Sequence, residues 1–87
     1  MIEVKVFGST PPCVKCREVT RRAKKVAEKY PGQIRVVHFD ALSDEGAKYG
    51  IFQVPTIVIN DKVVSAGKVP GQDEIENLII KQMESSR

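Results

Sequence analysis

The segment Ile2–Cys16, IEVKVFGSTPPCVKC, passes from a strand pattern to a helix start and places two cysteines three residues apart at the junction. Apolar and charged residues alternate over Ile2–Phe7, which predicts a half-buried strand. The loop residues Gly8–Pro12 end that strand. Cys13 and Cys16 then open a long amphipathic stretch. A helix start offers unpaired N–H groups and the positive end of the helix dipole, so it favours the thiolate, which is the nucleophilic form of cysteine.

A strand–helix–strand unit is predicted around this junction. Apolar residues recur at helical spacing from Val14 to Tyr30, and Pro31-Gly32 stops the helix. The short segment Ile34–Phe39 is rich in β-branched residues and reads as a second strand. Because a helix-length crossover joins the two strands, we expect them to be parallel.

The rest of the chain predicts two helices and a hairpin. Ser43 is expected to cap a short helix that runs to about Tyr49. The segments Thr56–Ile59 and Lys62–Ser65 flank Asn60-Asp61, which suits a two-residue turn between antiparallel strands. A last helix is predicted over Asp73–Met83, and Glu84–Arg87 is expected to be a polar tail. The predicted fold class is α/β: a four-stranded mixed sheet flanked by three helices, in the order β-α-β-α-β-β-α.

The length and composition restrict the classes of protein. With 87 residues, we expect a single domain over residues 1–87, and 41% hydrophobic and 29% charged residues are typical of a soluble globular protein. No apolar run approaches the roughly 20 residues of a membrane-spanning helix, and the first residues lack the pattern of a secretion signal. We therefore expect no membrane role and a cytoplasmic location. In that reducing compartment a C-x-x-C pair indicates redox chemistry rather than a structural disulfide.

The net charge of +3 reflects basic residues in the first predicted helix. A nucleic acid is one partner that such charge attracts, but no aromatic side chain is interleaved there for base stacking. The pattern favours a solvated helix face that adds positive potential near the cysteines, and we expect no nucleic-acid partner. These residues are Lys15, Arg17, Arg21, Arg22, Lys24, Lys25 and Lys29.

Two motifs together resemble the thioredoxin superfamily: Cys13-Val14-Lys15-Cys16 at the first helix, and Val54-Pro55-Thr56 just before the third strand. The resemblance covers nearly the whole chain. The length of the chain is closer to that of glutaredoxins and small archaeal thioredoxin-like proteins than to that of full-length thioredoxin. It implies a thioredoxin-like fold with Pro55 in a cis bond, packed against the disulfide. It also implies that the main chain of Val54 pairs with a substrate backbone, so Val54, Pro55 and Thr56 are candidate substrate-binding residues.

The two cysteines are expected to have different roles. Cys13 precedes the helix body and is the better nucleophile, with Lys15 adding charge that stabilises its thiolate. Cys16 shares a stripe with Val19 and Ala23, so it is expected to be buried and to act as the resolving thiol. The resemblance implies an oxidoreductase that reduces client-protein disulfides by dithiol exchange and is recycled by a reductase. We expect a monomer with no cofactor besides the Cys13–Cys16 disulfide.

Several residues depart from the family pattern. Thioredoxins have Trp before the first cysteine and Gly-Pro between the two, where this chain has Pro12 and Val14-Lys15. The buried acid that thioredoxins place six residues before the first cysteine is here Phe7, so proton transfer needs another group or water. The basic residue that holds glutathione in glutaredoxins corresponds to Thr10, although Gly71–Glu74 partly resembles their glutathione-binding turn. Dithiol exchange is therefore favoured over glutathione, which stays an alternative.

A metal-binding module is the rival from another class. Small copper chaperones also carry C-x-x-C between a first strand and helix, and thiolates suit Cu(I). Their order of elements differs, however, and zinc needs four ligands, for which only His38 and a carboxylate such as Asp40 remain. A lone strand histidine is typically exposed or hydrogen-bonded, so we assign His38 no chemistry and predict no metal site. A non-catalytic scaffold is a third interpretation.

Overall fold

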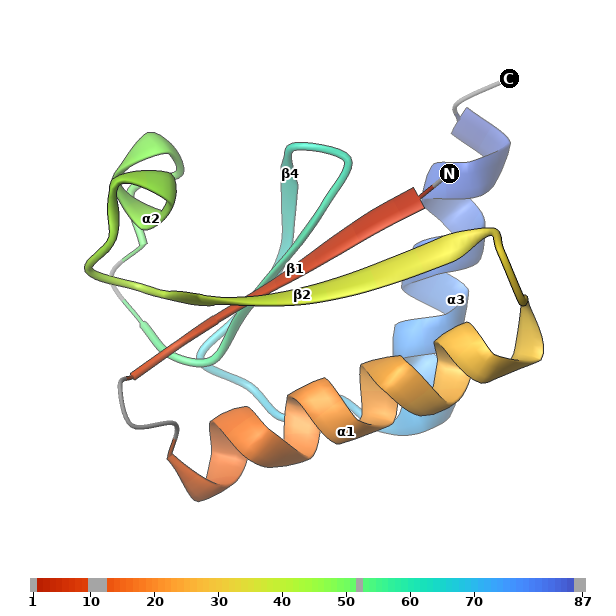
Figure 1. Ribbon diagram of the computed structural model, residues 1–87, viewed down its shortest axis with the longest axis horizontal. Coiled ribbons are helices and arrows are strands. Elements are labelled where there is room, and N and C mark those ends of the chain that lie inside the picture. Colours follow the sequence, from red (N-terminus) through yellow and green to blue (C-terminus); the bar gives the residue numbers. More distant parts are fainter. Residues whose placement is uncertain (1, 10–12, 52, 86–87) are drawn as a thin grey trace.

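The amino-terminal half of the chain forms a strand–helix–strand unit (Figure 1). The computed structural model describes residues 2–9, 13–51 and 53–85. The unit consists of β1 (Ile2–Gly8), α1 (Val14–Lys29) and β2 (Ile34–Asp40). The two strands are parallel and stay in register from Ile2↔Ile34 to Gly8↔Asp40, which confirms the predicted crossover. Each strand runs one residue beyond its predicted end.

A hairpin completes the sheet. β3 (Thr56–Ile59) pairs antiparallel with both β1 and β4 (Lys62–Ala66), giving the strand order β2-β1-β3-β4. Asn60 and Asp61 connect β3 to β4 with φ angles of 51° and 67°. These left-handed conformations are those of the predicted two-residue turn, which is confirmed. The mixed sheet is also confirmed.

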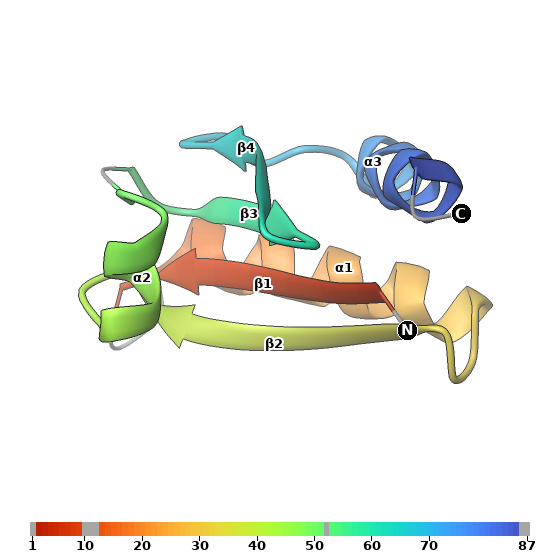
Figure 2. The same ribbon diagram turned by 90° about the horizontal axis from the view of Figure 1, so that it is seen from above.

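The two remaining helices lie on opposite sides of the sheet. Figures 1 and 2 show α1 and α3 (Gln72–Ser85) on one side, and α2 (Asp44–Lys48) on the other, beside the carboxyl end of β2. Ser43 caps α2 as predicted, because its side chain accepts a hydrogen bond from the Gly46 N–H. The predicted polar tail is wrong at Glu84 and Ser85, since α3 continues through them. Helix propagation adds a hydrogen bond per residue without needing apolar spacing.

The main core lies between the sheet and the helices α1 and α3. It consists of buried aliphatic side chains from the sheet and from both helices, and each fully buried valine or isoleucine contributes roughly 1.5–3 kcal/mol by leaving water. This packing fixes the carboxyl end of β1 relative to the first turn of α1, where the two cysteines are. The fully buried members are Val4, Val6, Val19, Ala23, Val26, Ile57, Ile59, Ile75 and Ile79.

The opposite face of β1 carries a smaller aromatic cluster. The Phe7 ring stacks on Phe39 with 5.5 Å between centroids and is tilted against Tyr49 at 5.7 Å. Residues on a strand alternate between the two faces of the sheet. Phe7, the residue that stands in place of the family's buried acid, therefore belongs to the α2 side and turns away from α1.

Candidate active site

Cys13 and Cys16 form a disulfide at the first turn of α1. Cys13 is the N-cap, with an extended backbone at φ −73° and ψ 168°, and the N–H of Cys16 donates to its sulfur at 3.1 Å. A capping side chain normally satisfies such an N–H with oxygen; here sulfur does so. The helix therefore directs a main-chain N–H of its first turn and its positive end at the Cys13 sulfur, as the sequence predicted.

The two sulfurs differ in exposure. Cys13 is half-buried, whereas Cys16 is fully buried beside Val19 and Ala23, as predicted. The carbonyl of Cys16 accepts a hydrogen bond from the Thr20 hydroxyl at 3.0 Å, which adds a contact one turn further along α1. Only Cys13 is accessible enough for a bulky disulfide to approach it.

Lys15 is exposed on the first turn of α1. Among the described residues its ammonium group makes no hydrogen bond to either sulfur, so its effect on the thiolate is through solvent-screened charge only. The first turn holds no acidic residue. Further along the helix, Arg21 and Arg22 donate to Glu18 and hold the pKa of that carboxyl down at about 2. Those two cations are thus already paired within α1.

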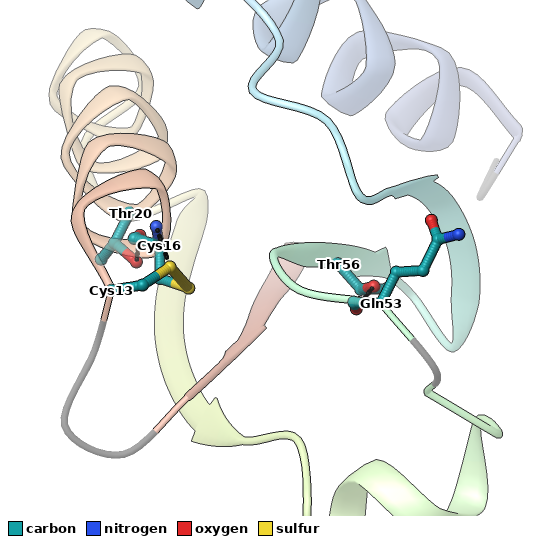
Figure 3. The surroundings of a disulfide bond; sticks show 5 residues. All are labelled: Cys13, Cys16, Thr20, Gln53 and Thr56. Atoms are coloured by element: carbon teal, nitrogen blue, oxygen red, sulfur yellow. Dashed lines mark hydrogen bonds between the residues drawn. A yellow bond between two sulfur atoms is a disulfide. The ribbon is translucent and has the colours of Figure 1, made fainter.

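The loop before β3 provides the second part of the site. The Val54–Pro55 bond is cis, and Figure 3 shows this loop, marked by Gln53 and Thr56, on the side of α1 toward which the disulfide points. The Thr56 hydroxyl donates to the Gln53 carbonyl at 2.6 Å, and the Gly67 N–H donates to the Pro55 carbonyl at 2.9 Å. These bonds fix the loop on both sides of Val54.

Val54 itself is exposed, and its main-chain polar groups lack partners among the described residues. The residue is 39% exposed, and within residues 2–9, 13–51 and 53–85 no hydrogen bond to its main-chain N–H or carbonyl is found. Because nearly all main-chain polar groups find partners in folded proteins, an open pair in a fixed loop is available to a bound chain. The expected substrate-binding residues thus lie in one fixed loop, in which the main-chain N–H and carbonyl of Val54 have no partner among the described residues.

An apolar surface adjoins this loop. A pocket of about 280 Å³ is lined by residues from the end of β1, the β2–α2 turn and the loop before β3, among them Gly8, Leu42 and Val54. Leu42 is 94% exposed and lines this pocket together with Val54, whereas Val14, the residue after Cys13, is 82% exposed but does not line it. Large exposed apolar side chains that gather at one place, as Leu42 and Val54 do, mark an interaction surface. Sequence analysis missed Leu42 because a single leucine in a turn carries no pattern.

The structure corrects the expectation for His38. The residue is half-buried, but its Nε2 atom is buried and has no hydrogen-bond partner within the described part of the chain, so this nitrogen is neither exposed nor hydrogen-bonded there. The strand register indicates which face of the sheet His38 occupies. His38 pairs with Val6, and the alternation that turns Ile2, Val4 and Val6 inward places His38 on the same face, toward α1.

Of the two positions related to glutathione binding, the structure describes only the second. Thr10 lies outside the described residues, and Gly71–Glu74 is the start of α3, where the Ile75 N–H donates to the Gly71 carbonyl at 3.0 Å. Asp73 and Glu74 occupy the first helical turn, where acidic residues are favoured by the helix dipole. This segment has the features of an ordinary helix start.

Among the residues that the structure describes, no three His, Cys, Asp or Glu side chains are grouped so that they could hold a metal ion. None of the helices in the described ranges is long and apolar enough to cross a membrane.

Comparisons with known proteins agree with this geometry. Residues 2–80 match the thioredoxin domain family. The chain is 38% identical to the Archaeoglobus fulgidus protein named Probable Thioredoxin, over 93% of this chain and 89% of that one, and 30% identical to the thioredoxin of Methanocaldococcus jannaschii, over 94% and 96%. The crystal structure of chloroplastic thioredoxin z superposes with a TM-score of 0.76 at 25% identity, over 98% of this chain and 80% of that one. The chain therefore belongs to the thioredoxin family.

Proposed function

We propose that this protein is a thiol–disulfide oxidoreductase that reduces disulfides of client proteins through Cys13 and Cys16. The observation that carries the proposal is the asymmetry of the pair: the Cys16 N–H donates to the sulfur of Cys13, which is half-buried, while Cys16 is fully buried. The first sulfur is both reachable and stabilised as a thiolate. The second is protected from solvent and lies within bonding reach of the first.

The reaction takes place in two exchanges. The Cys13 thiolate attacks one sulfur of the client disulfide, forming a mixed disulfide and releasing the other client sulfur as a thiolate, which takes up a proton. Cys16 then loses its proton and attacks the Cys13 sulfur. The Cys13–client bond breaks, its electron pair leaves with the second client sulfur, and the Cys13–Cys16 disulfide forms. Two electrons pass from the cysteine pair to the client.

The client is held by main-chain pairing and apolar contact. The open N–H and carbonyl of Val54 suit an extended peptide that adds alongside the loop, as in strand-addition recognition. The exposed side chains of Val14 and Leu42 favour an apolar residue next to the client cysteine. Since main-chain pairing is independent of sequence, this surface accepts clients of varied sequence.

The proposed function extends to the protein's oligomeric state, location, cofactor and partners. The protein works as a monomer in the cytoplasm, with no cofactor other than its own cysteine pair, and a reductase returns the pair to the dithiol form. Protein disulfides are preferred over glutathione mixed disulfides because the apolar surface and the open Val54 main chain suit a peptide. Both archaeal relatives bear the name thioredoxin, which supports this preference.

A substrate comparison tests the proposal. Wild-type protein with dithiothreitol should accelerate insulin disulfide reduction well above the rate with dithiothreitol alone, and should act more weakly on a small glutathione mixed disulfide supplied with glutathione. Rapid turnover with glutathione and none with insulin would contradict it. The reduction potential, measured in glutathione buffers, gives the direction of exchange: a value near about −270 mV indicates a reductant, and one near about −120 mV an oxidant.

A further inference from the structure

The resolving step needs a proton acceptor near Cys16. A thiol ionises with a pKa of about 8.5 in water, and burial in apolar surroundings works against the thiolate. Cys16 is fully buried, so the attack that completes the exchange requires a group that takes its proton inside the protein. The sequence position where the family has an acid is Phe7, which stacks on Phe39 on the far face of β1.

His38 and Cys16 meet at Gly8. A Cβ atom built on Gly8 would lie 2.9 Å from the Cys16 sulfur and 3.0 Å from His38 Nε2, so the sulfur and the nitrogen are no farther apart than those two distances combined. Either a direct contact after a small side-chain rotation or a single bridging water joins atoms at such a separation. The missing side chain of Gly8 is what lets the two groups approach each other.

The orientation of His38 suits proton transfer. Its Nε2 atom is buried and without a partner in the described residues, and leaving such an atom unsatisfied costs free energy. Unsatisfied buried polar atoms in native proteins call for a reason, of which a catalytic role is one. Imidazole is also the side chain whose ordinary proton affinity is best matched to neutral pH.

The other charged groups around His38 are engaged elsewhere or exposed. Asp40 accepts a hydrogen bond from the Leu42 N–H, and Glu45 pairs with Lys5 at 2.7 Å on the opposite face of the sheet. The exposed cations of the first α1 turn face solvent. The titratable groups of the elements next to His38 include Cys16, Lys15 and Arg17 on α1, Lys5 on β1, Asp40 on β2, and Asp44 and Glu45 on α2.

We propose that His38 is the general base of the resolving step: Nε2 of the neutral imidazole takes the proton of the Cys16 thiol, directly or through one water. The Cys16 thiolate then attacks the Cys13 sulfur of the mixed disulfide, the Cys13–client bond breaks, and the client sulfur leaves with the electron pair. The imidazolium passes its proton to the departing client thiolate or to solvent. This role rests on the proposed function and assigns it a proton acceptor.

A two-phase reaction separates the two exchanges. The reduced protein is mixed with 5,5′-dithiobis(2-nitrobenzoate), whose coloured thiolate is released once when Cys13 attacks and again when Cys16 resolves the mixed disulfide. His38→Gln keeps a polar side chain that cannot take a proton in this range. At pH 7 we expect the second phase to slow by about 100-fold or more, the lower end of general-base effects, and the first phase to stay within about twofold of wild type.

The pH dependence distinguishes a base from a structural residue. The deficit of His38→Gln should shrink above about pH 9, where hydroxide deprotonates a thiol without help. A second phase that is unchanged at pH 7, or that is slowed by the same factor at pH 7 and pH 9.5, would overturn the proposal. A first phase that is slowed as much as the second would overturn it as well.

Two further variants complete the design. Gly8→Ala places a methyl group between the sulfur and the imidazole and should slow the second phase while His38 remains; an unchanged second phase in this variant would contradict the proposal. Arg35→Gln, at an exposed position of the same strand, is the matched control and should behave as wild type. Urea unfolding verifies that each variant is folded. If wild type itself releases no second equivalent, the proposed dithiol exchange fails before His38 is in question.

Discussion

The two faces of the sheet differ in whether their polar side chains have hydrogen-bond partners. On the α2 face, Lys5 is 12% exposed in its side chain and donates to Glu45 at 2.7 Å and to the Tyr49 hydroxyl at 3.0 Å, while Tyr49 donates to Asp61 at 2.6 Å. On the α1 face, Nε2 of His38 has no partner in the described residues and lies near the Cys16 sulfur. One face has its charge satisfied, and the other keeps a titratable group available.

This difference between the two faces indicates that one face contributes to folding stability and the other to the disulfide exchange. The hydrogen bond to Glu45 is the main cause that raises the pKa of Lys5 far above its usual range, with Tyr49 second, so this ammonium stays charged and bound. A proton acceptor cannot be hydrogen-bonded in this way at its accepting atom, because an atom that already has a partner is not free to take a proton. We therefore expect changes on the α2 face to affect unfolding and changes at the disulfide end to affect catalysis.

The largest effect is expected for Cys13→Ser. A hydroxyl in place of the thiolate cannot form the mixed disulfide, so insulin reduction should fall to the rate of dithiothreitol alone, while the urea midpoint of the variant should match that of the reduced wild type. The assay is turbidity of reduced insulin with equal protein concentrations. Activity retained by Cys13→Ser but lost in Cys16→Ser would reverse the assigned roles.

Lys5→Met should lower stability without affecting catalysis. The change leaves Glu45 and Tyr49 without their shared donor, and hydrogen bonds to charged groups are worth roughly 1.5–3 kcal/mol each, so we expect a loss of about 2 kcal/mol or more in the free energy of unfolding. Insulin reduction per folded molecule should stay within about twofold. Urea unfolding at pH 7 provides the first quantity.

The matched control is Lys48→Met, which removes the exposed partner of the same carboxylate. Lys48 contacts Glu45 at 3.1 Å, but its side chain is 66% exposed, and such surface pairs contribute roughly 0–1 kcal/mol. Equal losses in the two lysine variants would show that burial of Lys5 is not what makes the pair strong.

Acid should remove the contribution of Glu45. The hydrogen bond from Lys5, followed by that from Lys48, holds the pKa of this carboxyl below its usual range. A lowered folded-state pKa gives stability that is complete above the unfolded value of about 4.3 and is lost as the pH falls through the folded value. The deficit of Glu45→Gln against wild type should thus be greatest near pH 6 and shrink toward pH 2.

Urea midpoints from pH 2 to pH 6 measure that deficit. Glu18 and Glu76, whose pKa values are also lowered, remain in both proteins and so cancel in the difference. Glu28→Gln, at an exposed α1 position with no ion pair within the described residues, serves as the control and should match wild type throughout. A deficit of Glu45→Gln that is constant with pH would mean that its charge is irrelevant.

The smallest effect is expected for Lys15→Glu. Brief iodoacetamide treatment of the reduced protein should label Cys13 before Cys16, because the helix N–H and the exposure both favour Cys13. Reversing the exposed charge should slow this labelling only about threefold or less, and 1 M salt should remove the difference, since the Debye length is then about 3 Å. A salt-independent slowing of tenfold would indicate a direct contact between Lys15 and the thiolate.

Most of the fold follows from local sequence patterns. Alternation in Ile2–Phe7, helical spacing after Cys13 and the Asn60-Asp61 turn each specify one element through near neighbours, and short connections limit how the elements assemble. The end of α3 is missed because Glu84 and Ser85 carry no apolar signal. The two cysteines and their different burial are predicted because a helix start and a helix stripe are local features.

The rest of the site depends on contacts between distant segments. Gly8 and His38 are 30 residues apart, and their approach to Cys16 exists only once β1 and β2 pair in the observed register. The Lys5 network likewise joins residues of β1, α2 and the hairpin turn. The open main chain of Val54 is a property of the folded loop and has no counterpart in composition or spacing.

Trapping of the mixed disulfide tests the proposed exchange most directly. A Cys16→Ser variant, reduced and mixed with insulin, should accumulate a covalent adduct because nothing resolves it, and peptide mapping should place the insulin chain on Cys13. Dithiothreitol should release the adduct completely. The Cys13→Ser variant, treated in parallel, should form at least tenfold less. An adduct found only in the Cys13→Ser protein, or in neither variant, would contradict an exchange that begins at Cys13.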